Sequence, residues 1–188
     1  MAAWFWYFLI YSFFGFLLEV VFARVTRNPK RDRKCFYLLP LCPVYGFGAL
    51  LILWAARFSG GDPWRVAVYS FFCATAAEYL MGLFYEKALG VAFWDYSHLP
   101  LNIGGKVCLL FSLAWCVLGL GLVYWVQPLV AAWVGRLPAA LTMPAFLLLA
   151  LDTGFTLNLL RTEGTTDALL WYRKPRRADA HPHRHEDA

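Results

Sequence analysis

Charged side chains are scarce in this 188-residue sequence and almost absent from long stretches of it. Asp, Glu, Lys and Arg make up only 15% of the residues, whereas 61% are hydrophobic and 19% are aromatic. Apolar residues make up about half of ordinary soluble domains, and uncharged windows of about 20 residues match the hydrocarbon thickness of a bilayer. The composition therefore excludes a soluble globular protein and predicts one that has lipid as part of its solvent.

Motifs of common hydrolytic and nucleotide-binding sites are also missing. The sequence has no P-loop, no G-x-S-x-G and no H-E-x-x-H. Any ATP hydrolysis would therefore need a separate ATPase chain, and no cofactor can be identified. The five cysteines are odd in number and lack a C-x-x-C pair, which predicts neither a disulfide framework nor a zinc site. The tail 181–185 holds alternating histidines without a second cluster of ligands, so we predict no metal site there.

Five apolar stretches are long enough to cross a bilayer, which predicts an all-α, polytopic integral membrane bundle within residues 1–160. The expected transmembrane spans cover residues 4–23, 36–56, 63–87, 107–126 and 138–160. The first lacks the basic flank and the cleavage site of a signal peptide, so it should stay in the membrane. Residues 161–188 are expected to form a short interfacial segment and a disordered tail.

Local signals define several ends of these spans. Asp62 is a candidate N-cap with Pro63 at the first helical position, and Pro128 is expected to end the fourth span. The second span begins with Pro40 and Pro43. Because proline lacks a backbone donor and restricts the preceding residue, this second helix should be broken at its start.

Basic residues divide unequally between the two sides of the predicted bundle. Of the 17 lysines and arginines, all except Arg57, Arg65 and Arg136 fall on one side. The positive-inside rule then predicts an N-terminus outside and a C-terminus in the cytoplasm, with the protein in the cell membrane. The same bias accounts for the basic segment 24–34, together with contact to anionic lipid, so no nucleic-acid partner is predicted.

Acidic residues within spans are candidates for an intramembrane polar site. Each costs about 2.5–3.5 kcal/mol on insertion scales and normally faces protein or a water-filled cavity. The four acids are Glu19, Glu78, Glu86 and Asp152. Helical spacing places small and polar residues in one stripe per helix. The stripes are Ser12-Gly15-Glu19, Thr75-Glu78-Gly82-Tyr85 with Glu86 just beside it, Ser112-Cys116-Gly119, which contains no acid, and Asp152-Thr156. We expect all four stripes to point inward, although the glycines also fit ordinary close packing of membrane helices.

The loop from Val91 to Lys106 is the second candidate site. It gathers Trp94, Asp95, Tyr96, Ser97, Asn102, Gly105 and Lys106 between two apolar runs. One interpretation is structural, with interfacial aromatic anchors, an Asx turn and a glycine turn. The other is a phosphate or lipid-headgroup site, in which Lys106 and the amides of Gly104 and Gly105 bind an anion at the start of the next helix.

Five motifs occur in an order that resembles a known family. They are Gly15-Phe-Leu-Leu-Glu19, Pro40-Leu-Cys42-Pro43-Val-Tyr45-Gly46-Phe-Gly48, Glu78-Tyr-Leu-Met-Gly82 with Glu86, Trp94-Asp95-Tyr96-Ser97, and Asn102 through Gly105 to Cys108. The chain thereby resembles the CmpB-like family, described as putative ABC-transporter type IV. The resemblance implies a small polytopic, permease-like membrane protein. Departures include Phe93 in place of a second tryptophan and Lys106 in place of arginine.

The leading hypothesis is an ABC-type permease-like component in the lipid bilayer, acting as a homo-oligomer or with a separate ATPase subunit. Glu19 and Glu78 would line a polar interior, Asp152 would extend it, and the segment from Pro40 to Gly48 would supply backbone ligands. The alternative is a membrane-embedded enzyme acting on a lipid or isoprenoid phosphate at the cytoplasmic face. A scaffolding subunit without chemistry is a third hypothesis. The substrate, the direction of transport and the energy source are not predicted.

Overall fold

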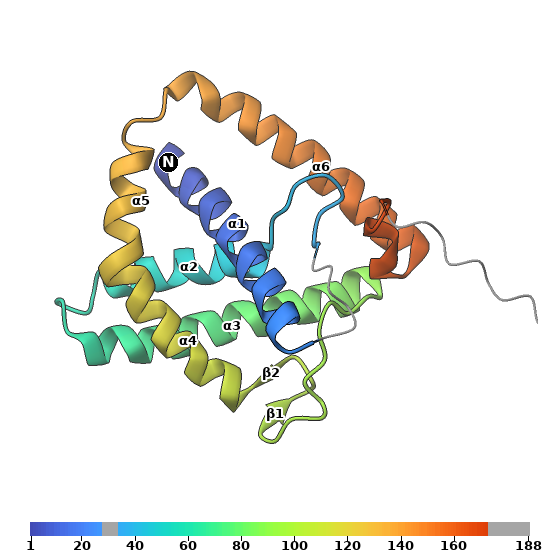
Figure 1. The fold of residues 1–188 in the computed structure, drawn as a ribbon, viewed down its shortest axis with the longest axis horizontal. Helices are drawn as coiled ribbons and strands as arrows, with labels where there is room; N and C mark the ends of the chain where they lie inside the picture. The colour runs from blue at the N-terminus through green and yellow to red at the C-terminus, as the bar shows by residue number, and fades with distance from the viewer. Residues whose placement is uncertain (28–33, 173–188) are drawn as a thin grey trace, which may run out of the picture.

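The computed structural model describes residues 1–27 and 34–172, and it is built almost entirely from helices (Figure 1). The helices are α1 (Ala2–Val25), α2 (Pro43–Ala56), α3 (Pro63–Leu89), α4 (Leu109–Gly121), α5 (Gln127–Val134) and α6 (Thr142–Glu163). A π-helical turn, Leu122–Val126, joins α4 to α5 without a break, and 3₁₀ turns lie at Ala139–Leu141 and Thr166–Leu169. The two short strands, β1 (Asn102–Ile103) and β2 (Val107–Cys108), form an antiparallel hairpin.

Four helical segments are long and apolar enough to cross a membrane, namely Ala2–Val25, Pro63–Leu89, Leu109–Val134 and Ala139–Glu163. The all-α bundle is therefore confirmed. The predicted cap of the third span is present, because the Trp64 amide donates to the Asp62 carboxylate at 2.9 Å. Helix α2 has only 14 residues, which corresponds to about 21 Å of helix. Residues 34–42 precede it as irregular backbone, so the second helix is broken at its start as predicted.

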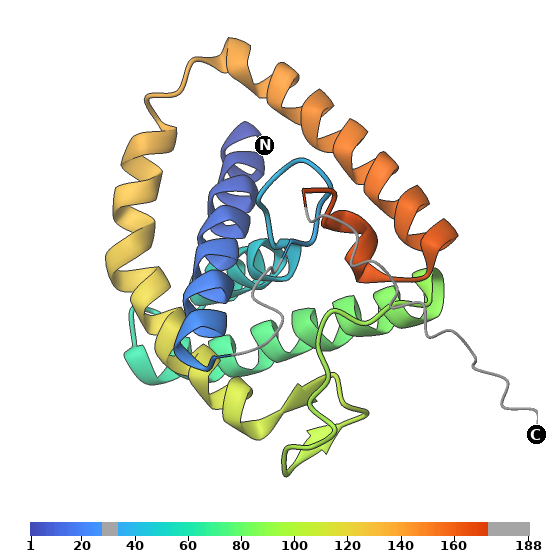
Figure 2. The ribbon, with the colours of Figure 1, turned by 45° about the vertical axis from the view of Figure 1, so that its right-hand side comes forward.

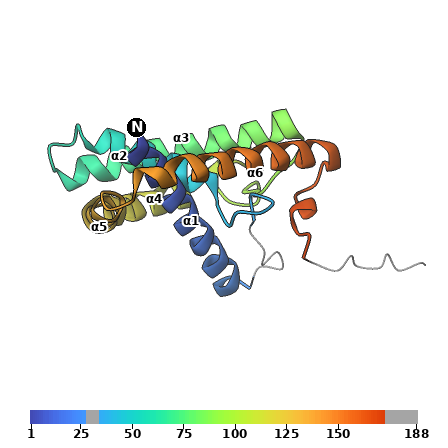
Figure 3. The ribbon, with the colours of Figure 1, turned by 90° about the horizontal axis from the view of Figure 1, so that it is seen from above.

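Helix α3 is central to the fold, since α2 and α4 both pack along it and α1 packs on α2 (Figure 1). Close approach depends on small residues. A Cβ at Gly15 would overlap the ring of Tyr45, and one at Gly119 would overlap Ser70. Helix α6 runs along the other side of the molecule and encloses the 34–42 segment with the rest of the bundle (Figure 2). Seen from above, α1 tilts away from the layer that contains α3 and α6 (Figure 3).

The expected end of the fourth span at Pro128 is wrong, because the helix continues to Val134. An α-helix would need an amide from position 128, which proline lacks. The preceding turn is π-helical instead, and the Gln127 amide donates to the carbonyl of Leu122, five residues back. A π turn is a common way for a helix to change its backbone spacing without ending.

Asp152 anchors the irregular backbone that precedes α2. The side chain is only 2% exposed. Its carboxylate accepts from the amide of Leu38 at 3.0 Å and from that of Leu39 at 2.8 Å, while the hydroxyl of Thr156 accepts from the Tyr37 amide at 3.0 Å. Irregular backbone at membrane depth needs such partners from protein. Asp152 therefore supports the broken start of the second helix from α6.

Replacing Asp152 should destabilise the fold. Asp152→Ala would leave the partly buried amides of Leu38 and Leu39 without their acceptor, and a buried amide without an acceptor costs about 1–3 kcal/mol. We expect a loss of about 3 kcal/mol in the free energy of unfolding, measured in detergent by denaturant titration. The neighbouring Thr153→Ala is the matched control, because Thr153 donates only within its own helix, to the carbonyl of Leu149. Equal stabilities of the two variants would contradict the assigned role.

Candidate functional site

Glu78 is a buried acid in α3, with an exposed fraction of 5%. Its two carboxylate oxygens accept from different parts of the chain. The Tyr96 hydroxyl donates to one oxygen at 2.9 Å, and the indole N–H of Trp115 in α4 donates to the other at 3.2 Å. Glu78 therefore joins the third helix, the fourth helix and the loop between them.

The loop is folded so that Tyr96 reaches this acid. The Tyr96 amide donates to the carbonyl of Gly105 at 2.8 Å, and its ring stacks on Phe111 with centroids 4.7 Å apart. Burial raises the pKa of the Tyr96 hydroxyl above its usual value, and the charge of Glu78 raises it further. The hydroxyl is thus kept protonated and remains a donor to Glu78.

Asp95 holds the backbone on either side of Tyr96. Its carboxylate accepts from the Ser97 amide at 2.8 Å and from the Ser97 hydroxyl at 3.0 Å. These hydrogen bonds, that of the backbone amide foremost, lower the pKa of Asp95. The arrangement is an Asx turn, which matches the structural interpretation of this residue.

The expected anion site at Gly104 and Gly105 has a different geometry from the predicted one. Both glycines have positive φ, 58° and 69°, and they form the turn between β1 and β2, whereas α4 begins only at Leu109. The Gly105 amide donates to the side-chain oxygen of Asn102 at 3.1 Å. The glycines are therefore not at a helix start, and the amide of Gly105 closes the hairpin.

Lys106 and Glu86 form an ion pair that attaches the hairpin to the end of α3. The Lys106 ammonium also donates to the Gly104 carbonyl at 3.2 Å. The backbone carbonyl of Lys106 accepts from the indole N–H of Trp94 at 2.8 Å. These residues border a small hollow of about 200 Å³. Glu86 and Lys106 thus fasten the loop beside the main cavity and do not line it.

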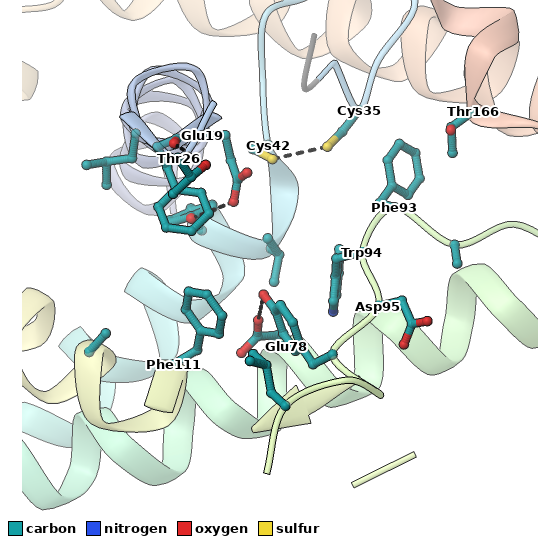
Figure 4. Close-up of a pocket in the computed structure, with 18 of the residues that line it drawn as sticks. Glu19, Thr26, Cys35, Cys42, Glu78, Phe93, Trp94, Asp95, Phe111 and Thr166 are labelled. Carbon is teal, nitrogen blue, oxygen red and sulfur yellow. Dashed lines mark hydrogen bonds between the residues drawn. The ribbon is translucent and has the colours of Figure 1, made fainter. Parts of the chain in front are cut away.

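The main cavity has a volume of about 860 Å³ and lies between α1, the start of α2, α3, α4 and the loop. Glu78 and Glu19 both line it, as Figure 4 shows. The Tyr45 hydroxyl donates to the Glu19 carboxylate at 2.8 Å. The centroids of the Tyr45 and Trp115 rings are 5.1 Å apart. Tyr45 and Trp115 therefore link the surroundings of the two acids.

The predicted site residues divide into two groups. Those that line the cavity are Glu19, Cys42, Tyr45, Glu78, Trp94, Asp95 and Tyr96. Those that lie outside its lining are Pro40, Pro43, Gly46, Glu86, Ser97, Asn102, Gly105, Lys106 and Asp152. The structure thus separates Asp152 from the polar interior that it was expected to extend.

Trp115 is the main residue that sequence reasoning missed. It follows Ser112 by one helical turn and so shares the polar stripe of the fourth helix, but its bulk and apolar ring resemble those of a lipid-facing residue. Its indole N–H was the available signal, because a buried tryptophan usually finds an acceptor.

Metal ligands do not cluster in the described ranges 1–27 and 34–172, where no group of three His, Cys, Asp or Glu side chains is suitably arranged. The histidines of 181–185 lie outside the described residues, as do positions 28–33 of the basic segment and the polar tail from 173 onward. The chemistry that the described site offers is therefore that of two carboxylates, aromatic rings and phenol or indole donors.

The apolar helices and the family comparison define a multi-pass membrane protein of a transporter class. A family described as "Putative ABC-transporter type IV", of the CmpB type, matches residues 6–160. The chain belongs to this family, as its five motifs indicated. No curated protein and no solved structure matches it.

Two cysteine thiols meet on the cavity wall, which offers a test of the wall's geometry. The sulfurs of Cys35 and Cys42 are 3.1 Å apart, and both side chains are buried. A small disulfide reagent should oxidise the two thiols to one intramolecular disulfide, with two electrons and two protons passing to the reagent, which is reduced to thiols. Intact mass analysis should show the loss of two hydrogens from the protein.

Variants define the outcome of this oxidation. Cys73→Ser should leave the product unchanged, whereas Cys35→Ser should abolish it. Formation of disulfide-linked dimers without any intramolecular product would contradict the described path of residues 34–42.

Proposed function

We propose that this chain is the permease-like, membrane-spanning component of a transporter and that its substrate occupies the cavity lined by Glu19 and Glu78. The observation that carries the proposal is the position of Glu78, a buried acid in a membrane helix that borders a cavity of about 860 Å³. Acids within spans mark substrate and ion pathways, and cavities of this volume suit small organic ligands. A purely structural acid would not need to border such a space.

The broken second helix supports the same proposal. Cys35 and Cys42 in the irregular segment and Val44 in the first turn of α2 line the cavity. Interrupted helices surround substrate sites in many transporters, because irregular backbone is tolerated where it lines a cavity. On this proposal Cys42, Val44 and Tyr45, the part of the Pro40–Gly48 segment that lines the cavity, border the substrate and offer it backbone groups.

The energy for transport would come from another protein. The sequence contains no P-loop, and the family is described as an ABC-transporter type. A separate ATPase subunit is therefore the partner that we propose, with self-association completing the path, since four membrane-length helices and the shorter α2 enclose little volume. We further propose a cell-membrane location with the N-terminus outside, which puts the loop 91–106 and the C-terminus on the cytoplasmic, ATPase side.

Profiling of a deletion strain tests this function. Loss of the gene should change the levels of one or more small metabolites, and wild-type protein should restore them. Glu78→Gln should fail to restore them, because it removes the buried acid. We expect at least about a tenfold fall in the rate of transport of the affected metabolite, which corresponds to about 1.4 kcal/mol.

Glu163→Gln is the matched control, because Glu163 is exposed at the end of α6 and does not line the cavity. It should restore the metabolites fully. Full restoration by Glu78→Gln, at equal protein levels, would contradict the proposal. A change confined to membrane lipids or isoprenoid phosphates would instead favour the membrane-embedded enzyme, and no change at all would favour a scaffolding subunit.

A further inference from the structure

Glu78 is a buried acid whose carboxylate the described part of the chain does not pair with a cation. Its hydrogen-bond donors are the phenol of Tyr96 and the indole of Trp115. Both are neutral groups, and neither can cancel the charge of a carboxylate. Burying a charge without a counter-charge is costly, so a cation beside Glu78 would gain an interaction that the described protein does not supply.

Two basic residues, Arg27 and Lys34, line the cavity, but neither forms an ion pair with Glu78 in the described part of the chain. The Lys34 ammonium donates to the carbonyl of Tyr37. Its nitrogen also lies over two aromatic rings, 5.6 Å from the centroid of Trp171 and 5.7 Å from that of Tyr172. Lys106 is paired with Glu86 outside the cavity. Arg27 also lines the cavity, but it is an exposed residue beyond the last turn of α1. Four acids line the cavity, Glu19, Glu78, Asp95 and Asp167, and Glu78 is the buried one, which makes it the buried negative end of the cavity.

Aromatic rings form much of the wall around this negative end. They belong to Tyr45, Phe93, Trp94, Tyr96, Phe111 and Trp115, all of which line the cavity. A cation within about 6 Å of the centroid of such a ring is attracted by the ring's quadrupole. The attraction is worth about 2 kcal/mol when water is excluded. Figure 4 shows Trp94, Phe93 and Phe111 around the same space as Glu78 and Glu19. A carboxylate within an aromatic wall is the arrangement that recognises ammonium and similar cations.

The size of the cavity indicates the kind of cation. A volume of about 860 Å³ is far larger than a metal ion would fill, and the described residues offer no cluster of three metal ligands. The apolar rings would instead contact the body of a drug-sized organic molecule.

We propose that the cavity binds an organic cation with an apolar body, with its positive centre against Glu78 and its body against the aromatic wall. The inference rests on the proposed function, because it names the class of substrate for the same cavity. An organic anion of equal size should be rejected, since Glu78 would repel it.

A pair of probes separates charge from shape. Tetraphenylphosphonium and tetraphenylborate have nearly the same size and shape and opposite charge. Equilibrium dialysis with the purified full chain in detergent, corrected for binding to protein-free micelles, should give saturable binding of tetraphenylphosphonium alone. This comparison uses only the wild-type protein, so it does not depend on the folding of a variant.

Variants then locate the bound cation. Glu78→Gln should weaken tetraphenylphosphonium binding by at least about tenfold, which corresponds to about 1.4 kcal/mol. Phe111→Leu should weaken it severalfold without changing charge, and Glu163→Gln should leave it unchanged. Size-exclusion profiles and thermal unfolding should show that each variant is folded.

Three results would overturn the inference: equal binding of the two ions, no saturable binding by folded wild-type protein, or unchanged binding by folded Glu78→Gln. Its failure can be distinguished from failure of the transport function. If the folded protein binds neither probe while Glu78→Gln still fails to restore metabolites, the cation class is wrong and transport stands. If the cation binds through Glu78 while Glu78→Gln restores the metabolites fully, transport is wrong and the cation site stands.

Discussion

A carboxylate buried in a membrane helix must find hydrogen-bond donors within the protein, and this constraint at Glu78 organises the site. One donor comes from α4, through Trp115, and the other comes from the loop, through Tyr96. To bring the Tyr96 hydroxyl to the acid, the loop needs the Asp95 turn and the β1–β2 hairpin that fix its backbone. The cavity is thus bounded by groups that are held in position because they satisfy one acid.

A second constraint acts on the other side of the bundle, where irregular backbone precedes α2. Here the acid is Asp152, and its partners are the backbone amides of Leu38 and Leu39. The two buried acids therefore differ in kind. Asp152 is surrounded by amides that require it, whereas Glu78 faces a cavity through neutral aromatic donors. This difference is the reason to assign a ligand to Glu78 and a structural role to Asp152.

Much of the helical framework follows from the sequence, because span length, the Asp62-Pro63 start and the paired prolines are local signals. The stripe argument also identified Glu78 and Glu19, since helical spacing fixes which residues share a face. Features that depend on tertiary partners were missed. The function of Asp152 depends on a segment more than 100 residues away, and the helix passes Pro128 because a π turn precedes it. The glycines at 104 and 105 form a hairpin turn, which their composition alone could not distinguish from a helix start.

The contact between Glu78 and Tyr96 is the centre of this account, and a double-mutant cycle tests it most directly. Glu78→Leu, Tyr96→Phe and the double variant would be compared with the wild type by their free energies of unfolding in detergent. A hydrogen bond to a charged acceptor predicts a coupling energy of about 1.5–3 kcal/mol. A cycle of Tyr96→Phe with Glu163→Gln should be additive within about 0.5 kcal/mol. Additivity of the Glu78 and Tyr96 substitutions would contradict the account, because the loop would then not be held by the buried acid.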